Sequence, residues 1–403
     1  MYNTKLTILP RLDLVDSREK SITIRVKKST HKFSRNALAS GNGNVNIFGS
    51  ESYNTINGRN YNFINMEYTL PIIRIKSDSY YNMNIVNDTE YYFNFHWHGL
   101  TVSPEEDGAL IVLAFGPGTP SNNFRITGTL ANNSAITLNH THNMDMASTF
   151  LYSGLLNFIN IEDDISAPVD NLFNYNESNS NFLQLVYQDI DLNNDGTLND
   201  DKLYDFSWRA KYGAINGTSC INWDNNDNNF VDKLYYESNK NVVKVTLLNA
   251  ACSYRNIYLG VCDNNSNIQN FYLVQTDQGY RNPTLVNICS FSIANRNSIM
   301  FDLNDFPNNE AYLFLYNYDL TNNPIENNGI KPFLKIYNKI PQIIPYNVYL
   351  PVNNQLKRYL KGKCPNSNVI NASQCFYSGN SYTNFNMNLQ NIIRQIRIIV
   401  FGN

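Results

Sequence analysis

The sequence is poor in charged residues and in long apolar runs. Charged residues make up 16% of the 403 residues and the formal net charge is −3, so there is no basic excess of the kind that binds nucleic acid. No apolar run reaches the length of a membrane span. The first ten residues lack the apolar core of a secretory signal. These absences predict a soluble protein that is not exported by the secretory route and binds neither nucleic acid nor membrane.

Cysteine is missing from the first half of the chain. All six cysteines lie between Cys220 and Cys375, and none forms a C-x-x-C pair, which argues against a zinc ribbon. Cys364 and Cys375 flank a short polar loop, where they either form a disulfide or remain free thiols, depending on the redox compartment. The cysteines therefore indicate no metal site and leave the pairing open.

Helical periodicity is missing as well. The chain holds 28 tyrosines and 22 phenylalanines, an aromatic content that favours strands. Alternating or continuous apolar residues predict strands at 21–26, 68–75, 80–86, 123–127, 134–140, 154–161, 182–187, 242–249, 271–274, 311–317 and 392–400. We therefore expect an all-β protein composed of Greek-key β-sandwiches with short strands.

Histidine is scarce, yet its placement is not even. Of the five histidines, four form two His-x-His pairs, His96 with His98 and His140 with His142, while His31 stands alone. Side chains two residues apart on a strand leave the same face, so each pair presents two imidazoles together. Four neutral nitrogen ligands suit copper, zinc, nickel or iron. Chance clustering is the alternative, and we favour a metal site over it; we expect no catalytic role for His31.

Motifs around these pairs follow an order typical of a known family. In the first part of the chain they are HWHGL at 96–100, Pro104 to Asp107-Gly108, Pro117-Gly118, HTH at 140–142 and GLLNFINIED at 154–163. In the second part they are LVYQD at 185–189, AING at 214–217, VTLLNA at 245–250 and QTDQG at 275–279. Through most of its length the sequence resembles a laccase-like, three-domain multicopper oxidase of the cupredoxin superfamily.

The resemblance implies a domain plan of tandem cupredoxin-like β-sandwiches. Residues 1–165 would form a first domain with both histidine pairs, 166–320 a second domain without ligands, and 321–403 a connector and a partial third domain. His96 would bind the single-histidine copper, and His98, His140 and His142 the coupled copper pair. No histidine follows His142, so the other half of the trinuclear site and the cysteine-ligated copper, which the family's third domain supplies, are not provided by these residues.

Two further motifs each have two interpretations. Asp107 resembles the family's acid that assists proton delivery to oxygen, or it is simply the first residue of an Asp-Gly turn. Asp191, Asn193 and Asp195 stand at positions 1, 3 and 5 of a calcium loop, but Lys202 replaces its bidentate glutamate. For this second motif we favour a polar hairpin turn over a calcium site.

Taken together, the sequence predicts a degenerate multicopper-oxidase-like protein with a structural or assembly role. It would retain a four-histidine copper site, vestigial or unoccupied, and would associate with copies of itself or with other structural proteins through open sheet edges. About one residue in six is asparagine, far above ordinary usage, which we interpret as AT-rich coding of the kind found in giant DNA viruses. This predicts a component of the virion. The alternatives are an active oxidase completed by a third domain absent from these residues, and a simple copper- or zinc-binding module.

Overall fold

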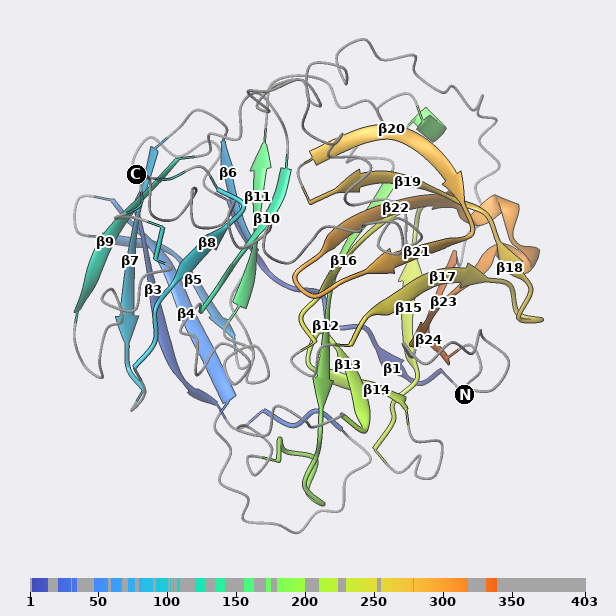
Figure 1. The fold of residues 1–403 in the computed structure, drawn as a ribbon, viewed down its shortest axis with the longest axis horizontal. Coiled ribbons are helices and arrows are strands. Elements are labelled where there is room, and N and C mark those ends of the chain that lie inside the picture. The colour runs from blue at the N-terminus through green and yellow to red at the C-terminus, as the bar shows by residue number, and fades with distance from the viewer. Residues whose placement is uncertain are drawn as a thin grey trace, which may run out of the picture. The chain divides into compact units, whose positions relative to one another are not determined.

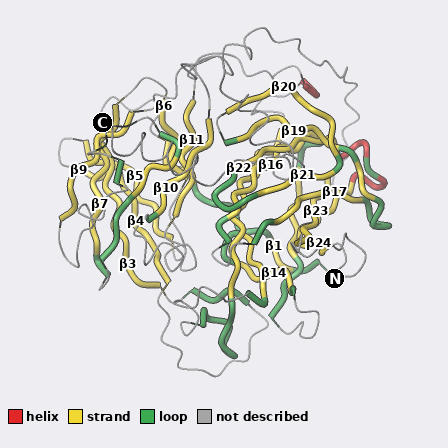
Figure 2. Tube along the Cα trace, in the orientation of Figure 1, coloured by secondary structure: helices red, strands yellow, loops and turns green. Residues whose placement is uncertain are grey.

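The computed structural model confirms the all-β expectation: its described residues form strands and loops, with three short 3₁₀ turns at Leu172–Asn174, Leu303–Asp305 and Pro307–Asn309 (Figure 2). It describes residues 2–13, 21–29, 31–34, 47–56, 59–66, 72–76, 80–89, 92–100, 102, 104, 107–108, 120–127, 135–141, 156–162, 172–174, 180–199, 210–223, 230–251, 255–277, 279–317 and 331–338. Within these ranges no helix is long and apolar enough to cross a membrane.

The first sandwich, as we call it, comprises two five-stranded sheets (Figure 1). One sheet has the order β2 (Arg11–Asp13), β6 (Ile72–Lys76), β11 (Leu156–Glu162), β10 (Ala135–His140) and β8 (His96–His98). The other has the order β5 (Arg59–Met66), β4 (Ile47–Ile56), β3 (Ser21–Ser29), β7 (Tyr80–Asn87) and β9 (Pro120–Thr127). Strand β7 buries Tyr81, Met83 and Ile85 and exposes Asn82 between them, as expected for a strand with one face toward a core.

The second sandwich comprises two seven-stranded sheets. One has the order β1 (Thr4–Lys5), β15 (Leu234–Ser238), β24 (Lys331–Asn338), β23 (Glu310–Asn317), β17 (Ile257–Cys262) and β18 (Ile268–Gln269), with β21 (Ile288–Phe291) also paired to β17. The other has the order β14 (Thr218–Asn222), β13 (Tyr212–Ile215), β12 (Ser180–Ile190), β16 (Val242–Asn249), β22 (Arg296–Asp302), β19 (Phe271–Thr276) and β20 (Gly279–Val286). Every residue of β16 is buried, and β12 and β22 pair with its two edges.

Strand connections in both sandwiches include crossovers. Strand β3 pairs in parallel with β7, β11 with β6, and β12 with β16. A parallel pair cannot be closed by a tight hairpin, so the chain passes between sheets. The strands predicted at 80–86, 242–249 and 311–317 are confirmed by β7, β16 and β23. The strand predicted at 392–400 lies outside the described residues, as do Cys364 and Cys375.

Two strands pair with strands outside the domain ranges expected from the sequence. Strand β1 lies within the range 1–165, yet it pairs in parallel with β15 of the second sandwich. Strand β24 lies after residue 320, in the range expected to be a connector, and it pairs with β15 and β23. The N-terminal residues therefore belong to the second sandwich before β2 enters the first, and the second sandwich extends at least to Asn338.

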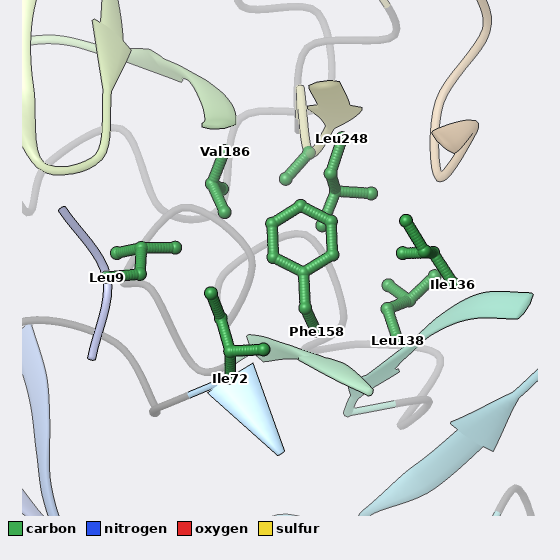
Figure 3. Close-up of a cluster of buried hydrophobic side chains, with 8 residues drawn as sticks. Leu9, Ile72, Ile136, Leu138, Phe158, Val186 and Leu248 are labelled. Carbon is green, nitrogen blue, oxygen red and sulfur yellow. The ribbon is translucent and has the colours of Figure 1, made fainter. Parts of the chain in front are cut away.

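An apolar cluster joins the two sandwiches (Figure 3). Its buried members from the first sandwich and the segment leading to it are Leu9, Ile72, Ile136, Leu138 and Phe158, and those from the second are Val186, Leu248 and Ala250. Beside it the amides of Asn160 and Gln184 exchange two hydrogen bonds of 2.9 and 3.0 Å. Because Leu138 precedes His140 by two residues on β10, the two side chains leave the same face of the strand, so this contact adjoins the histidine cluster.

Candidate metal centre

The two histidine motifs lie on adjacent antiparallel strands. In the register of β8 with β10, His96 is opposite His140 and His98 is opposite Leu138. Trp97, between the two histidines of β8, is buried, whereas both histidine side chains are only partly buried. The period-two alternation of a strand thus turns the indole toward the core and both imidazoles to the opposite face. This is the arrangement that the spacing of the first pair predicts.

Three imidazoles converge at this point. His96, His98 and His140 each offer one ring nitrogen, and these atoms all lie within 4.8 Å of one another. Nδ1 of His98 is 3.3 Å from Nε2 of His140. Two nitrogen ligands at about 2.0 Å from a tetrahedral metal ion are themselves about 3.3 Å apart. The pair therefore already has the spacing that a shared metal ion requires.

Backbone carbonyls set the tautomers of two of the rings. Nδ1 of His140 donates to the carbonyl of Thr141 at 2.6 Å, and Nδ1 of His96 donates to the carbonyl of Asp107 at 3.1 Å. A carbonyl oxygen only accepts, so each Nδ1 carries the proton and each Nε2 presents a lone pair. Such bonds to the far nitrogen are how proteins orient metal-binding histidines.

Asp107 lies against His96 because Gly108 lets its loop approach β8. The Asp107 carbonyl also accepts from the Trp97 amide at 3.1 Å, and Oδ2 of Asp107 is 3.3 Å from Nδ1 of His96. Gly108 has φ +72, and a Cβ there would stand 1.6 Å from the carbonyl oxygen of Phe95. Only glycine fits this position. Asp107 is thus both a residue of a tight loop and a direct neighbour of His96, and its role in proton transfer remains a prediction.

Asn139 is a site residue that sequence reasoning missed. It is fully buried, and its Nδ2 donates to the carbonyl of His96 at 3.2 Å. The bond ties β10 to β8 at the level of the imidazoles, in addition to the ladder. An asparagine on a predicted strand did not by itself indicate which carbonyl it would bind.

The other two histidines of the chain are His142 and His31. His142 is outside the described residues. His31 is near the second sandwich, where its Nε2 lies 2.6 Å from the Gly217 carbonyl and its ring packs edge-on against Phe33, so it takes no part in the histidine cluster.

The Asp191–Asn199 segment is a hairpin closed by a bridge between Leu192 and Leu198. Oδ1 of Asp195 accepts from the amide and hydroxyl of Thr197, and Oδ1 of Asp191 accepts from the Lys211 amide at 2.9 Å. Two of the carboxylates that a calcium loop would use are therefore bonded to the protein itself.

The comparisons with known proteins agree with this geometry. Residues 50–165, which include both histidine pairs, match the family model described as multicopper oxidase. A search of curated proteins finds no match. The matched residues lie in the first sandwich and are similar to the multicopper oxidase family, and copper is the metal that this family implies.

Solved structures similar to the chain are themselves multicopper oxidases. The McoA multicopper oxidase from the hyperthermophile Aquifex aeolicus has a TM-score of 0.61 at 17% identity, over 87% of this chain and 68% of that one. The laccase-like CueO from Ochrobactrum sp. has a TM-score of 0.59 at 16% identity, over 85% and 65%. A metallo-oxidase from Campylobacter jejuni has a TM-score of 0.58 at 17% identity, over 88% and 65%. At these identities the likeness establishes the fold, and the chain spans about two thirds of the length of each.

Proposed function

We propose that the protein binds copper through His96, His98, His140 and His142. The observation that carries the proposal is the 3.3 Å separation between Nδ1 of His98 and Nε2 of His140. Neutral imidazoles are ligands that copper and zinc both accept, and the family match of residues 50–165 favours copper. When bound, copper would supply one-electron redox chemistry.

The chain's own residues would do three things at this centre. The carbonyls of Thr141 and Asp107 hold protons on the far nitrogens, so that lone pairs face the ion. Asn139 fixes β10 against β8 and so fixes the distance between the rings. The carboxylate of Asp107, 3.3 Å from the His96 ring, is placed to accept a proton from water beside that ring.

We infer that these residues serve a binding or structural role rather than an oxidase reaction. The 403 residues contain five histidines, and by the family resemblance a trinuclear cluster needs further histidines from a third domain. We retain the proposed division into domains at 1–165, 166–320 and 321–403, with β1 and β24 as contributions to the second sandwich. Edge strands such as β9 and β20 would allow self-association, and the asparagine-rich composition fits a place in a viral particle. Fractionation of assembled particles tests this association. A wholly monomeric, particle-free protein would contradict it.

An oxidase completed by ligands from elsewhere is the second candidate. The observation that favours it is that His96 and His98 are only partly buried, which leaves the face of the cluster open to ligands from another segment or chain. Oxidation of a phenol by the copper-loaded 403-residue protein, above the rate of free copper, would overturn the structural role.

Copper content distinguishes binding from chance clustering. We expect the purified protein to retain copper after loading and desalting, and the His98→Ala/His140→Ala double variant to lose it. The matched control is His31→Ala, which removes an imidazole that contacts Gly217 and Phe33 instead and should retain copper like the parent. Equal copper content in the parent and the double variant, measured by elemental analysis, would contradict the proposed site.

A further inference from the structure

The end of the β8–β10 ladder lies beside a side chain from the second sandwich. The last pair of the ladder is His98 with Leu138, and β10 extends beyond it through Ile136 to Ala135. The carbonyl of Ile136 accepts a hydrogen bond of 3.2 Å from Nε of Arg296, the first residue of β22. A residue 160 positions away in the sequence thus binds the strand that carries His140.

The same guanidinium lies over the turn that follows His98. The Leu100 amide donates to the Trp97 carbonyl at 3.2 Å, which closes a four-residue turn with Gly99 at φ +82. A Cβ on Gly99 would stand 3.3 Å from Nη2 of Arg296, a distance tighter than ordinary van der Waals contact. Gly99 therefore allows both the turn and the close approach of the arginine.

Arg296 is itself held rigidly. Its side chain is 3% exposed, Nη1 lies 3.1 Å from Oδ1 of Asp277, and Nη2 donates to the Asp277 carbonyl at 3.1 Å. Nη1 also donates to the Ala294 carbonyl at 2.8 Å. The Asp277 carboxylate in turn accepts from the Arg296 amide at 2.6 Å and from the side chain of Asn295. The rigid fork of an arginine, fixed in this way, presents Nε in one direction.

We propose that Arg296 is a positioning residue for the metal centre. It holds the end of β10 and the turn after His98 in one arrangement, and thereby sets the spacing between the His98 and His140 nitrogens. This inference rests on the proposed function, because it assigns the arginine a role toward the copper ligands. It also explains why a sandwich without ligands would matter to metal binding: the Asp277–Arg296 pair supports the histidine strands at the Ile136 end of β10.

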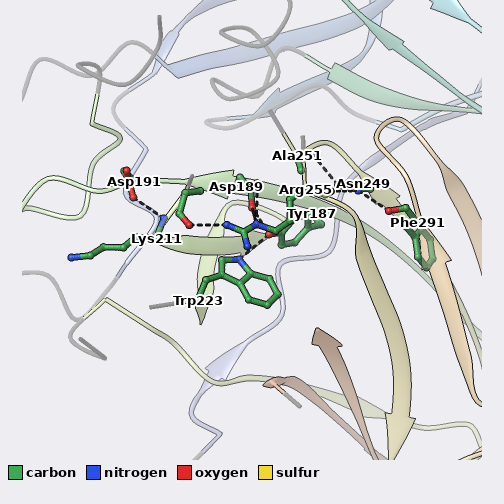
Figure 4. Close-up of polar contacts among 10 residues, drawn as sticks. Tyr187, Asp189, Asp191, Lys211, Trp223, Asn249, Ala251, Arg255 and Phe291 are labelled. Atoms are coloured by element: carbon green, nitrogen blue, oxygen red, sulfur yellow. Dashed lines mark hydrogen bonds and ion pairs between the residues drawn. The ribbon is translucent and has the colours of Figure 1, made fainter. Parts of the chain in front are cut away.

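The substitution Arg296→Lys distinguishes a positioning role at the metal centre from a general contribution to folding stability. Arg296→Lys keeps a positive charge beside Asp277 but loses the planar fork that reaches Ile136. The chain offers a matched control in Arg255→Lys (Figure 4). Arg255 is 4% exposed and pairs with buried Asp189 at 3.1 Å. Within the described residues its contacts are with Asp189, the Ala210 carbonyl and the Trp223 ring, and none is with β8 or β10.

The experiment measures Cu(II) affinity and the Cu(II) electron paramagnetic resonance spectrum of the parent and both variants. Removing residues that orient metal ligands typically weakens metal affinity about 10- to 100-fold, so we expect Arg296→Lys to weaken Cu(II) binding about 10-fold and to change the spectrum. Arg255→Lys should bind Cu(II) with parental affinity and spectrum, even if both variants unfold at similarly lower temperatures. Amide exchange of the metal-free proteins should rise in β10 and at Gly99 for Arg296→Lys alone.

The outcomes separate the two proposals. A parent protein that binds no Cu(II) contradicts the proposed function, and with it the role of Arg296 toward the metal. A parent that binds Cu(II), with Arg296→Lys indistinguishable from it in affinity, spectrum and exchange, contradicts the positioning role alone, as does an equal effect of Arg255→Lys. If Arg296→Lys does not fold, the Arg296→Gln/Asp277→Asn double variant, which removes both buried charges together, is judged by the same criteria.

Discussion

Replacing Gly108 by alanine should damage both the fold and the metal centre. The new Cβ would stand 1.6 Å from the Phe95 carbonyl oxygen and 2.5 Å from its carbon, whereas such atoms normally stay more than about 3 Å apart. The loop that carries Asp107 must therefore withdraw from β8. In doing so it would lose its hydrogen bonds from the Trp97 amide and the His96 ring, both 3.1 Å long.

The expected loss of stability has two sources, the positive φ at position 108 and the two lost hydrogen bonds. An alanine at φ +72 is disfavoured by about 1–2 kcal/mol, and each lost hydrogen bond contributes about 1 kcal/mol. We expect Gly108→Ala to lower the free energy of unfolding by about 3–4 kcal/mol, measured by urea denaturation, and to weaken Cu(II) binding because His96 loses the bond that fixes its tautomer.

The control for the backbone effect is Gly196→Ala. Gly196 has φ +84 in the Asp191–Asn199 hairpin, so its replacement should cost about 1–2 kcal/mol and leave Cu(II) affinity unchanged. Equal destabilisation by the two substitutions, or parental Cu(II) affinity in Gly108→Ala, would refute the reasoning that the Asp107 loop orients His96.

Three further predictions concern single side chains. Asn139→Ala should lower the free energy of unfolding by about 1–2 kcal/mol, because it removes the bond to His96, whereas the exposed Asn82→Ala should change it by less than about 0.5 kcal/mol; equal effects in urea denaturation would contradict this. Burial raises the pKa of Asp302 to about 6, above the value near 3.9 of an unfolded chain. The folded protein therefore holds this proton more tightly, and stability should fall as pH rises from about 4 to 6; Asp302→Asn should flatten that slope in denaturation series, and an unchanged slope would count against the assignment. Burial raises the pKa of the Cys289 thiol to about 12, so it should resist alkylation at pH 8 in the native state and react after unfolding, as read by peptide mass spectrometry.

Local rules of sequence predicted the strands and the histidine arrangement well. A strand's period of two places His96 and His98 on one face, and the alternating residues of β7 show the same rule on a half-buried strand. These features depend on neighbours in sequence, so they are visible without a structure.

Features that depend on distant contacts were not predictable in the same way. The choice of β15 as the partner of β1 depends on strands more than 200 residues apart. Arg296 showed no sign of its contact with Ile136, because an arginine at the start of a strand is ordinary in composition. The bond of Asn139 to His96 depends on the register of two strands, which neighbours in sequence do not reveal.

The location of bound copper tests the central claim most directly. Crystals of the protein soaked with Cu(II) and measured at the copper absorption edge should show an anomalous peak about 2 Å from both Nδ1 of His98 and Nε2 of His140. A peak at another place on the protein, or no peak within reach of these two nitrogens, would contradict the account.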